Sequence, residues 1–428
     1  MSTPIILLLV IMVGGILLGF PIVWAMMSGC IACLMLEPNL VLTIVPQKVF
    51  LGLNNFAFLA IPCFLLCGDI MARGGLSRRL CDFCNALVGW LKGGLSIVAI
   101  IACAIFAAIS GSAVATTAAI GGIMHPEMVK RGYSSPYSAA LPAVAGTLGI
   151  IIPPSIVFVI YGSTNGVSIS KLLMSGMLPG ILTAVVLCLY GYVVAKKENF
   201  PKSFDQFSLK RVLKSLKGAV WALMMPLIIL GGIYGGIFTP TESAMIACAY
   251  GLVVSFFVTK ELTVKNFFDV VSKTAASTAN VTVMFLAAQV FGFLIAYYDI
   301  TTTIANFFVA VSPNWIIFMG LVFILLTITG MFMEVGATNV ILSPLLAPVA
   351  AAFGIDPIHF GMVFVFLLAL GQATPPFGST MFIACGISGE RVAAVIRRLL
   401  PFVLVEYACA LVFAYVPWFS TFLPSLMA

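Results

Sequence analysis

Long apolar runs with almost no charged residues limit most strongly what this chain can fold into. The runs 172–195, 219–238 and 399–424 are each long enough to cross a bilayer, since an apolar helix needs about 20 residues to do so. Their apolar residues are continuous and do not alternate with polar ones, which favours helices over the strands of a membrane barrel. We therefore expect an all-α polytopic membrane protein.

The overall composition excludes several other classes of protein. Of 428 residues, 62% are hydrophobic and 8% are charged, whereas soluble domains carry roughly 25% charged residues. A soluble enzyme, a secreted disulfide-rich domain, a disordered regulator and a nucleic-acid binder are all incompatible with this balance. The expected solvent for most of the chain is the lipid bilayer, and no nucleic-acid partner is expected.

Basic residues indicate which loops face the cytoplasm. The net charge is +7, and seven Lys and Arg residues gather in the hydrophilic segment 196–217. Cytoplasmic loops of membrane proteins collect Lys and Arg, so this segment is predicted to be a cytoplasmic linker at the midpoint of the chain. The pairs Cys30/Cys33 and Cys81/Cys84 have metal-site spacing but no neighbouring His, so we expect them to be small packing residues.

Three short matches predict an internal repeat. Residues 58–64 (FLAIPCF) match 285–291 (FLAAQVF) at an offset of 227, and 111–113 (GSA) match 336–338 (GAT) at an offset of 225. The third match joins Pro153-Pro154 to Pro375-Pro376 at an offset of 222. The three offsets drift slowly and stay in chain order, as expected for two copies that have diverged.

The charges of the two copies predict that they are inserted in opposite directions. Segment 57–156 contains six Lys and Arg residues and segment 285–380 contains none. If positively charged loops stay inside, matching turns of the copies lie on opposite sides of the membrane. This is an inverted-topology repeat, which in secondary transporters places substrate and ions at the interface of the copies.

Each copy interrupts its apolar helices twice. The first copy has Ser110-Gly111-Ser112 and then GTLGIIIPPS at 146–155, and the second has EVGATN at 334–339 and then GQATPPFGS at 371–379. Gly and Pro free backbone groups that lipid cannot satisfy, so such breaks must face protein or a wet cavity. Freed carbonyls with Ser and Thr hydroxyls suit a small cation such as sodium, and half-helix N-termini suit a carboxylate. The alternative is that these are ordinary helix kinks or small-residue contacts.

Two acidic residues are compatible with transport mechanisms other than sodium coupling. Glu334 precedes the second break, and Glu242 lies in PTESA just after a Gly-rich helix end. An acid at membrane depth favours a functional role, so a proton-driven carrier or a channel that uses Glu242 or Glu334 is an alternative. Glu242 is equally well explained as a helix-capping residue. An intramembrane enzyme would need a nucleophile, base or metal motif that the chain lacks, and a purely structural subunit would not need four helix breaks.

Five stretches in chain order resemble the large membrane subunit of tripartite ATP-independent periplasmic (TRAP) transporters: FLAIPCFLLCGDIMARGG, GSAVATTAAIGG, GTLGIIIPPS, FTPTESA and GQATPPFG. The resemblance implies an elevator fold, with a scaffold and a transport domain built from two re-entrant hairpins and two broken helices. It also implies sodium-coupled import of an organic acid, such as a C4-dicarboxylate or a sialic acid, across the bacterial inner membrane. The implied partners are a periplasmic substrate-binding protein and a small membrane subunit, which we expect to be a separate chain.

The same resemblance assigns site residues. It implies at least two sodium ions, the first held by Ser110, Gly149, Ile152 and Pro154 and the second by Gly336, Gly371, Thr374 and Phe377. Ser112, Ser155 and Glu334 would face the substrate. We expect scaffold helices at 1–56 and repeat 1 at 57–170, which includes an amphipathic arm helix at 76–92. Segment 171–274 is expected to contain further scaffold helices, the cytoplasmic linker and a second arm helix. Repeat 2 is expected at 275–390, and a C-terminal helix at 391–428.

Overall fold

The computed structural model describes residues 3–54 and 56–427, and within them the chain forms helices and no strands. Two antiparallel short helices begin the chain, and a third follows. The elements of the first half are α1 (Thr3–Leu17), α2 (Ile22–Leu36), α3 (Ile44–Leu53), η1 (Phe56–Leu59), α4 (Ala60–Arg73), α5 (Leu76–Val88), α6 (Gly94–Ser110), α7 (Ala113–Lys130), α8 (Ser135–Ala145), α9 (Leu148–Ile151), α10 (Ile156–Asn165) and α11 (Ile169–Lys197).

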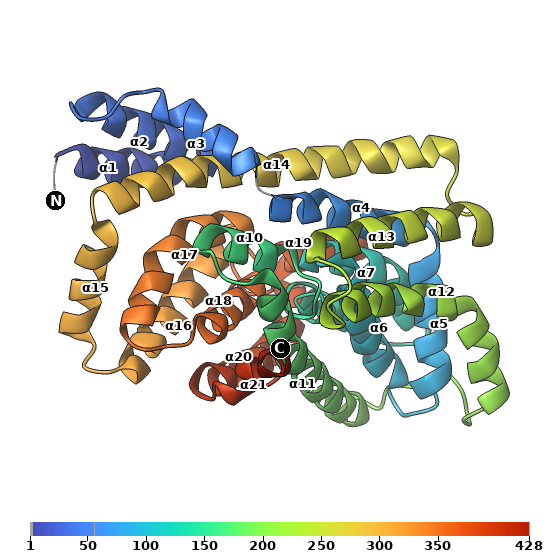
Figure 1. The fold of residues 1–428 in the computed structure, drawn as a ribbon. Coiled ribbons are helices and arrows are strands. Elements are labelled where there is room, and N and C mark those ends of the chain that lie inside the picture. Colours follow the sequence, from blue (N-terminus) through green and yellow to red (C-terminus); the bar gives the residue numbers. More distant parts are fainter. Residues whose placement is uncertain (1–2, 55, 428) are drawn as a thin grey trace.

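The second half begins after the hydrophilic linker. Its elements are α12 (Leu209–Tyr234), α13 (Pro240–Val253), the π-helix η2 (Val254–Val258), α14 (Val264–Tyr297), α15 (Ile300–Val311), α16 (Trp315–Phe332), α17 (Val335–Ala352), α18 (Pro357–Gly371), α19 (Ser379–Ser388), α20 (Val392–Tyr415), α21 (Trp418–Thr421) and η3 (Pro424–Leu426). Figure 1 shows α14 running along one edge of the molecule, with α1–α3 near its C-terminal end and α13 near its N-terminal end.

Length and hydropathy make this a polytopic membrane protein, as the sequence predicts. Seven helices among the described residues are long and apolar enough to cross a bilayer, or up to nine if each of two bent pairs is counted as one span. One bent pair ends the chain, where α20 and the segment Trp418–Leu426 meet at 83°. The run 399–424 is therefore not one straight span. Pro417 explains the bend, because proline offers no N–H to continue the helix.

Each copy of the repeat is a helical hairpin followed by a broken helix. In the first copy α6 and α7 form the hairpin, which turns at Gly111 with φ of 63°. The broken helix runs through α8, α9 and α10 and is interrupted at 152–155. In the second copy α16 and α17 form the hairpin, and α18 and α19 form the broken helix, interrupted at 372–378. The fold therefore has the two hairpins and two broken helices expected.

The two copies exchange equivalent contacts. Helix α10 packs against α17, and its equivalent α19 packs against α7 (Figure 1). Asn165 of α10 donates to Ser343 of α17 at 2.9 Å. At an offset of 222, the equivalents of these two residues are Ile387 of α19 and Gly121 of α7. They are also neighbours, since a Cβ atom at Gly121 would lie 3.5 Å from Ile387. Reciprocal contacts of this kind define a two-fold relation.

The structure corrects the register of the hairpins. The predicted match of Gly111 with Gly336 has an offset of 225, but the residues that cap α7 and α17 are Ser112 and Glu334, at an offset of 222. This is also the offset of the two Pro-Pro pairs, whose peptide bonds are both cis. The glycine match was wrong because a helix-capping side chain, and not a shared residue type, fixes the start of the second hairpin arm.

The first match of the repeat keeps its offset of 227. Phe58 and Phe285 are equivalent at this offset, and their rings stack with centroids 4.5 Å apart. Equivalent residues touch each other only near a two-fold axis. Buried positions also recur at this offset: Ala60, Ile61, Phe64, Cys67 and Gly68 of α4 correspond to Ala287, Ala288, Phe291, Leu294 and Ile295 of α14.

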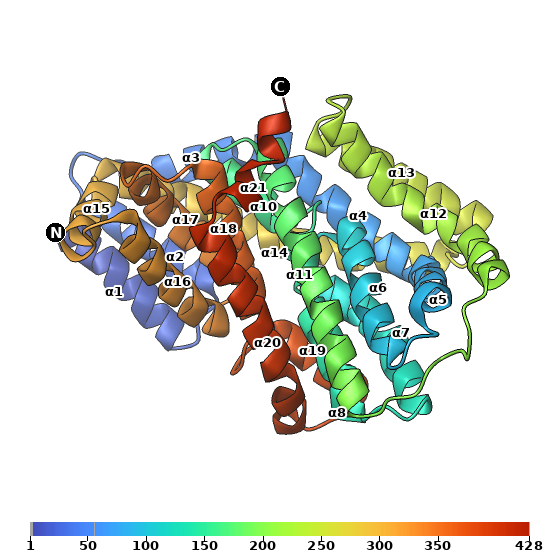
Figure 2. The ribbon, with the colours of Figure 1, turned by 90° about the horizontal axis from the view of Figure 1, so that it is seen from below.

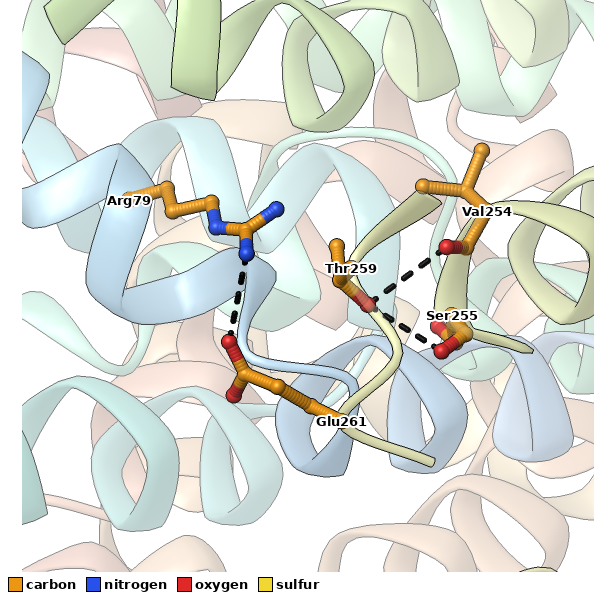
Figure 3. A network of polar contacts seen from close by, with 5 residues as sticks. All are labelled: Arg79, Val254, Ser255, Thr259 and Glu261. Atoms are coloured by element: carbon orange, nitrogen blue, oxygen red, sulfur yellow. Dashed lines mark hydrogen bonds and ion pairs between the residues drawn. The ribbon is translucent and has the colours of Figure 1, made fainter. Parts of the chain in front are cut away.

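Two long helices in the middle of the molecule and one ion pair at its side complete the arrangement. Helices α11 and α20 run side by side through the middle of the molecule (Figure 2), and each contacts both broken helices. At the other side, Arg79 of α5 pairs with Glu261 at 3.3 Å, and Thr259 donates to the carbonyls of Val254 and Ser255 (Figure 3). The Arg79–Glu261 pair joins the predicted arm helix, which the structure ends at Val88, to the segment that follows α13, and the Thr259 bonds lie within that segment.

Candidate functional site

The tip of the first hairpin is a cluster of three hydroxyls, of which Ser110 and Thr116 are buried and Ser112 is half-buried. Ser110 ends α6 and lies 2.8 Å from the hydroxyl of Thr116. Thr116 in turn lies 2.8 Å from the carbonyl oxygen of Ser112, to which it donates. Ser112 caps α7 by accepting from the backbone N–H of Ala115 at 3.4 Å. Three hydroxyls and a carbonyl thus gather at a tip that lipid could not solvate.

The first broken helix meets this tip without space for a side chain. A Cβ atom at Gly149 would lie 2.5 Å from the carbonyl oxygen of Ser112, and one at Gly111 would lie 2.9 Å from that of Pro154. The Gly111 carbonyl also accepts from the N–H of Ile156 at 3.4 Å. The sequence-predicted residues Ser110, Gly149 and Pro154 are therefore brought together.

Ile152, the fourth predicted ligand of the first site, lies between α9 and the Pro-Pro pair. Its N–H donates to the Leu148 carbonyl at 2.8 Å. Its side chain faces α11, since a Cβ atom at Gly180 would lie 2.6 Å from it. Only the backbone oxygen of Ile152 could therefore contribute to an ion site.

Helix N-termini converge at the first break. Ser112 caps α7, and the buried Ser155 caps α10 by accepting from the N–H of Phe158 at 3.4 Å. The bond between Gly111 and Ile156 joins the two N-termini directly. Each N-terminus carries about half a positive charge and offers N–H groups. Both substrate-facing serines predicted from the sequence thus stand where an anion would be stabilised.

The second hairpin repeats the capping pattern with an acid in place of the serine. Glu334 caps α17 by accepting from the N–H of Ala337 at 3.0 Å, and Thr338 donates to the Glu334 carbonyl at 2.9 Å. A Cβ atom at Gly371 would lie 2.6 Å from the backbone of Gly330. Gly371 therefore plays the part that Gly149 plays in the first copy, where helix backbone meets hairpin backbone.

The other predicted residues of the second site are more dispersed. Thr374 donates to the Leu370 carbonyl at 2.7 Å and lies 3.1 Å from the Tyr407 hydroxyl of α20. The ring of Phe377 is 61% exposed and lies 5.9 Å from that of Phe332. Gly336 is the second residue of α17, and a Cβ atom there would lie 2.9 Å from the Glu334 carboxylate and 3.5 Å from Met284 of α14. The structure thus places Gly371, Thr374 and Phe377 around one loop, and Gly336 at the start of α17 between Glu334 and α14.

One buried side chain joins the two copies near their breaks. Asn339, in the second turn of α17, donates to the carbonyl of Val157 in the first turn of α10 at 2.9 Å. The first turns of these two helices are therefore neighbours, so that three helix N-termini (α7, α10 and α17) lie near one another. Glu334 is exposed beside this group, whereas Ser155 is buried within it.

Glu242 lies outside the breaks and has a structural partner. It forms a capping box at the start of α13, in which its carboxylate accepts from the N–H of Thr239 at 2.8 Å and its own N–H donates to the Thr239 hydroxyl at 3.3 Å. A capping box satisfies two N–H groups that the helix cannot. The capping interpretation of Glu242 is therefore confirmed.

The sequence analysis overlooked Glu406. This residue of α20 is 0% exposed, and one of its carboxyl oxygens lies 2.7 Å from the hydroxyl of Thr147, between α8 and α9. The signal was present, because Glu406 is an acid inside the apolar run 399–424 and such acids favour a functional role. The cysteines Cys30, Cys33, Cys81 and Cys84 are all buried, as packing residues should be.

Comparison with known proteins identifies the family. The profile of the family described as "Tripartite ATP-independent periplasmic transporter, DctM component" matches residues 6–419. The isethionate TRAP transporter permease protein DctMQ of Oleidesulfovibrio alaskensis is 40% identical over 94% of this chain, which spans 63% of that protein's length. The C4-dicarboxylate TRAP transporter large permease protein DctM of Vibrio cholerae is 36% identical over 98% of this chain and 97% of that protein.

A solved structure shares the fold at low sequence identity. The crystal structure of the Alcanivorax borkumensis YdaH transporter superimposes with a TM-score of 0.62, over 97% of this chain and 98% of that one, at 14% identity. The family match over nearly the whole chain and the relatives at 36–40% identity agree with the hairpins and broken helices described above. The chain belongs to the DctM family, the large permease component of bacterial TRAP transporters.

Proposed function

We propose that this protein imports a small organic acid into the bacterial cell across the inner membrane, driven by sodium. The first break carries the proposal, because it combines a buried set of hydroxyl and carbonyl oxygens with two converging helix N-termini. Oxygen ligands suit a small hard cation, and helix N-termini suit a carboxylate. One such site can bind both a sodium ion and an anionic substrate without a buried charged side chain.

The sodium ions would be held mainly by backbone oxygens. In the first site Ser110, Gly149, Ile152 and Pro154 are the proposed ligands, since Gly149 and Pro154 lie against the hairpin tip. In the second site Gly336, Gly371, Thr374 and Phe377 are proposed. The Thr374 hydroxyl already donates to the Leu370 carbonyl, so it can offer its lone pair to an ion while keeping that bond.

The substrate is proposed to be an acid bound at Ser112, Ser155 and Glu334. Relatives named for isethionate and C4-dicarboxylate transport share an anionic group on a small molecule. The N-termini of α7 and α10 would bind that group. Glu334 is exposed beside them, and its negative charge would favour a substrate that carries hydroxyl or amide donors as well as the acid.

Transport is proposed to follow an elevator mechanism. The two hairpins and two broken helices would move together, as one transport domain, relative to the scaffold. The reciprocal packing of α10 on α17 and of α19 on α7 supports this, because it ties the copies into one unit. The proposed partners are a small membrane subunit and a periplasmic binding protein that delivers the acid.

Uptake by proteoliposomes that contain this protein with both partners tests the proposal. Accumulation of the acid should require an inward sodium gradient and should survive collapse of a pH gradient. Ser110→Ala is expected to raise the half-saturating sodium concentration about tenfold, the effect of losing one oxygen contact worth about 1.4 kcal/mol. The matched control is Ser215→Ala on α12, whose hydroxyl bonds only within its own helix.

Two outcomes would reject the proposal. Uptake that is unchanged without a sodium gradient would remove sodium as the coupling ion. Uptake that follows an imposed pH gradient and is abolished by Glu334→Gln would instead support the proton-driven alternative.

A further inference from the structure

A carboxyl group lies fully buried where α20 crosses the first broken helix. Glu406 is 0% exposed, and its Oε1 atom is 2.7 Å from the Thr147 hydroxyl. Its Oε2 atom is also buried and has no hydrogen-bond partner in the part of the chain that the structure describes. The ion pairs found among those residues involve other acids, namely Glu127, Glu198 and Glu261. An isolated buried carboxylate is strongly unfavourable.

The contacts of the Thr147 hydroxyl favour a protonated carboxyl group at Glu406. The Thr147 hydroxyl has one proton, yet it lies 2.7 Å from the Val144 carbonyl and 2.7 Å from Glu406. An ionised Glu406 can only accept from Thr147, which leaves the Val144 contact without that proton. A neutral Glu406 with its proton on Oε1 satisfies both contacts, because it can donate to the Thr147 hydroxyl while that hydroxyl donates to the Val144 carbonyl. The remaining Oε2 atom is then a neutral carbonyl oxygen, which is much less costly to bury than a charge.

Among residues 3–54 and 56–427, Glu406 has no ion-pair partner that would stabilise its ionised form. Helix α20 packs against α8, α11, α16, α18 and α19. The basic residues of α20 itself, Arg397 and Arg398, lie two turns before Glu406, and Arg398 pairs with Glu198. The other titratable residues of α20 are Tyr407, Cys409 and Tyr415, and those on the helices packed against it are Tyr137, Lys171, Cys188, Tyr190, Tyr192, Lys196, Lys197, His359 and Cys385.

None of these basic groups forms an ion pair with Glu406 in the part of the chain that the structure describes. Both ring nitrogens of His359 are bonded, to the Ser420 hydroxyl at 2.7 Å and to the Ala414 carbonyl at 3.1 Å. Lys171 stands in the first turn of α11, and Lys196 and Lys197 stand in its last turn. Glu406 therefore faces an apolar interface with a single hydroxyl.

The neighbouring residue links α20 to the other copy. Glu406 contacts Thr147 in the first broken helix, and Tyr407 lies 3.1 Å from Thr374 in the loop of the second. Two consecutive residues of α20 thus touch both broken helices. We propose that Glu406 is a proton-binding site, occupied in the conformation seen here and emptied when α20 and the first broken helix separate enough to admit water.

The expected chemistry is a simple dissociation. The Glu406 carboxyl passes its proton to the water that enters when the helices separate, which leaves a carboxylate, and the Thr147 hydroxyl would then turn to donate to that carboxylate. The Val144 carbonyl would keep its bond from the Thr147 N–H, which measures 2.9 Å. Apart from the separation of α20 from the first broken helix, only the Thr147 hydroxyl has to reorient, so the site could exchange its proton in each conformational cycle.

Infrared spectroscopy of the purified protein tests the occupied state. At neutral pH the wild type should show the C=O stretch of a protonated carboxyl that is absent from Glu406→Gln and retained in the control Glu127→Gln, whose acid pairs with Arg131. Thr147→Val should keep that band but shift it, because its hydrogen bond is lost. Loss of a carboxylate band in Glu406→Gln, or an unshifted band in Thr147→Val, would overturn the assignment. This readout does not depend on sodium coupling or on transport.

The pH dependence of uptake tests the exchange. At a fixed sodium gradient, uptake by the wild type should decline as the pH rises through the range in which Glu406 loses its proton. Uptake by Glu406→Gln should stay constant within twofold over the same range, and Glu127→Gln should follow the wild type. If Glu406→Gln and the wild type share one pH profile, the proton is a fixed structural one and the exchange proposal fails.

Discussion

The two breaks use the same backbone arrangement but differ in what surrounds it. In both, a residue at the hairpin tip caps the second arm, and a threonine four residues later bonds back to it: Thr116 to Ser112, and Thr338 to Glu334. The side chains of Ser110, Thr116 and Ser155 at the first break are buried, whereas Phe332 and Phe377 at the second are 60% and 61% exposed.

Side chains, and not the fold, account for this difference. At the offset of 222, the buried Ser155 that caps α10 corresponds to the exposed Phe377, and the N-cap of α19 is Gly378, which has no side chain to cap the helix. The same backbone arrangement thus occurs twice, once with buried side chains around the break (the first break) and once with exposed ones (the second break, here called the open break). We therefore expect ions and substrate to exchange more easily through the second break in this conformation.

Replacing Gly149 and Gly371, the equivalent glycines of the two breaks, should have the largest effect on substrate uptake. The two replacements test whether the backbone is equally rigid at both breaks. A Cβ atom at Gly149 or at Gly371 would lie 2.5–2.6 Å from hairpin backbone, and backbone cannot move aside as a side-chain end can. Gly149→Ala and Gly371→Ala should each lower substrate uptake by about 100-fold, from a misfit worth about 3 kcal/mol at the site. Uptake by proteoliposomes at a fixed sodium gradient measures this.

Gly122→Ala is the matched control, because no atom lies within 4 Å of a Cβ atom there. It should keep the uptake of the wild type. If Gly371→Ala were tolerated while Gly149→Ala was not, the second break would be flexible enough to absorb the extra atom. The two breaks would then differ in backbone rigidity as well as in exposure.

Removing a hydrogen bond at the interface between the two copies should have a smaller effect on stability. Asn339 donates to Val157 of the other copy, whereas its equivalent Thr117 donates to Pro142 within its own copy at 3.3 Å. Asn339→Leu keeps the volume and removes the bond, so it should cost about 1 kcal/mol and lower the Tm by roughly 2 °C. Thr117→Val should leave contacts between the copies intact. Equal sensitivity of substrate uptake to both changes would show that the bond across the interface has no special role.

The positions of the breaks could be predicted from the sequence because they depend on local chemistry. Gly and Pro in apolar runs predicted breaks at 110–112 and 146–155, and the structure interrupts the helices at 111–112 and 152–155. The second hairpin was less predictable. A break was expected at 334–339, but α17 already begins at Val335, since Glu334 accepts from Ala337 and starts the helix there.

Contacts between distant segments could not be predicted. Nothing in the sequence near Glu406 indicates Thr147, which is 259 residues away, and the same is true of Thr374 and Tyr407. The predicted ligand Gly336 was assigned by the family resemblance and stays a prediction. The structure adds that the residue which caps the second hairpin arm is Glu334, two positions earlier.

The smallest expected effect concerns the open break itself. The rings of Phe332 and Phe377 lie 5.9 Å apart at an interplanar angle of 52°, and join the second hairpin tip to the loop of its broken helix. Exposed aromatic pairs contribute about 0.5 kcal/mol beyond burial, so a double-mutant cycle with Phe332→Ala and Phe377→Ala should give a coupling of this size in thermal unfolding. If the second break closes when ions and substrate bind, the coupling should grow once both are added, because the rings would lose water. A coupling that is the same with and without ligands would mean that this break stays open throughout, and exchange would then have to be controlled elsewhere.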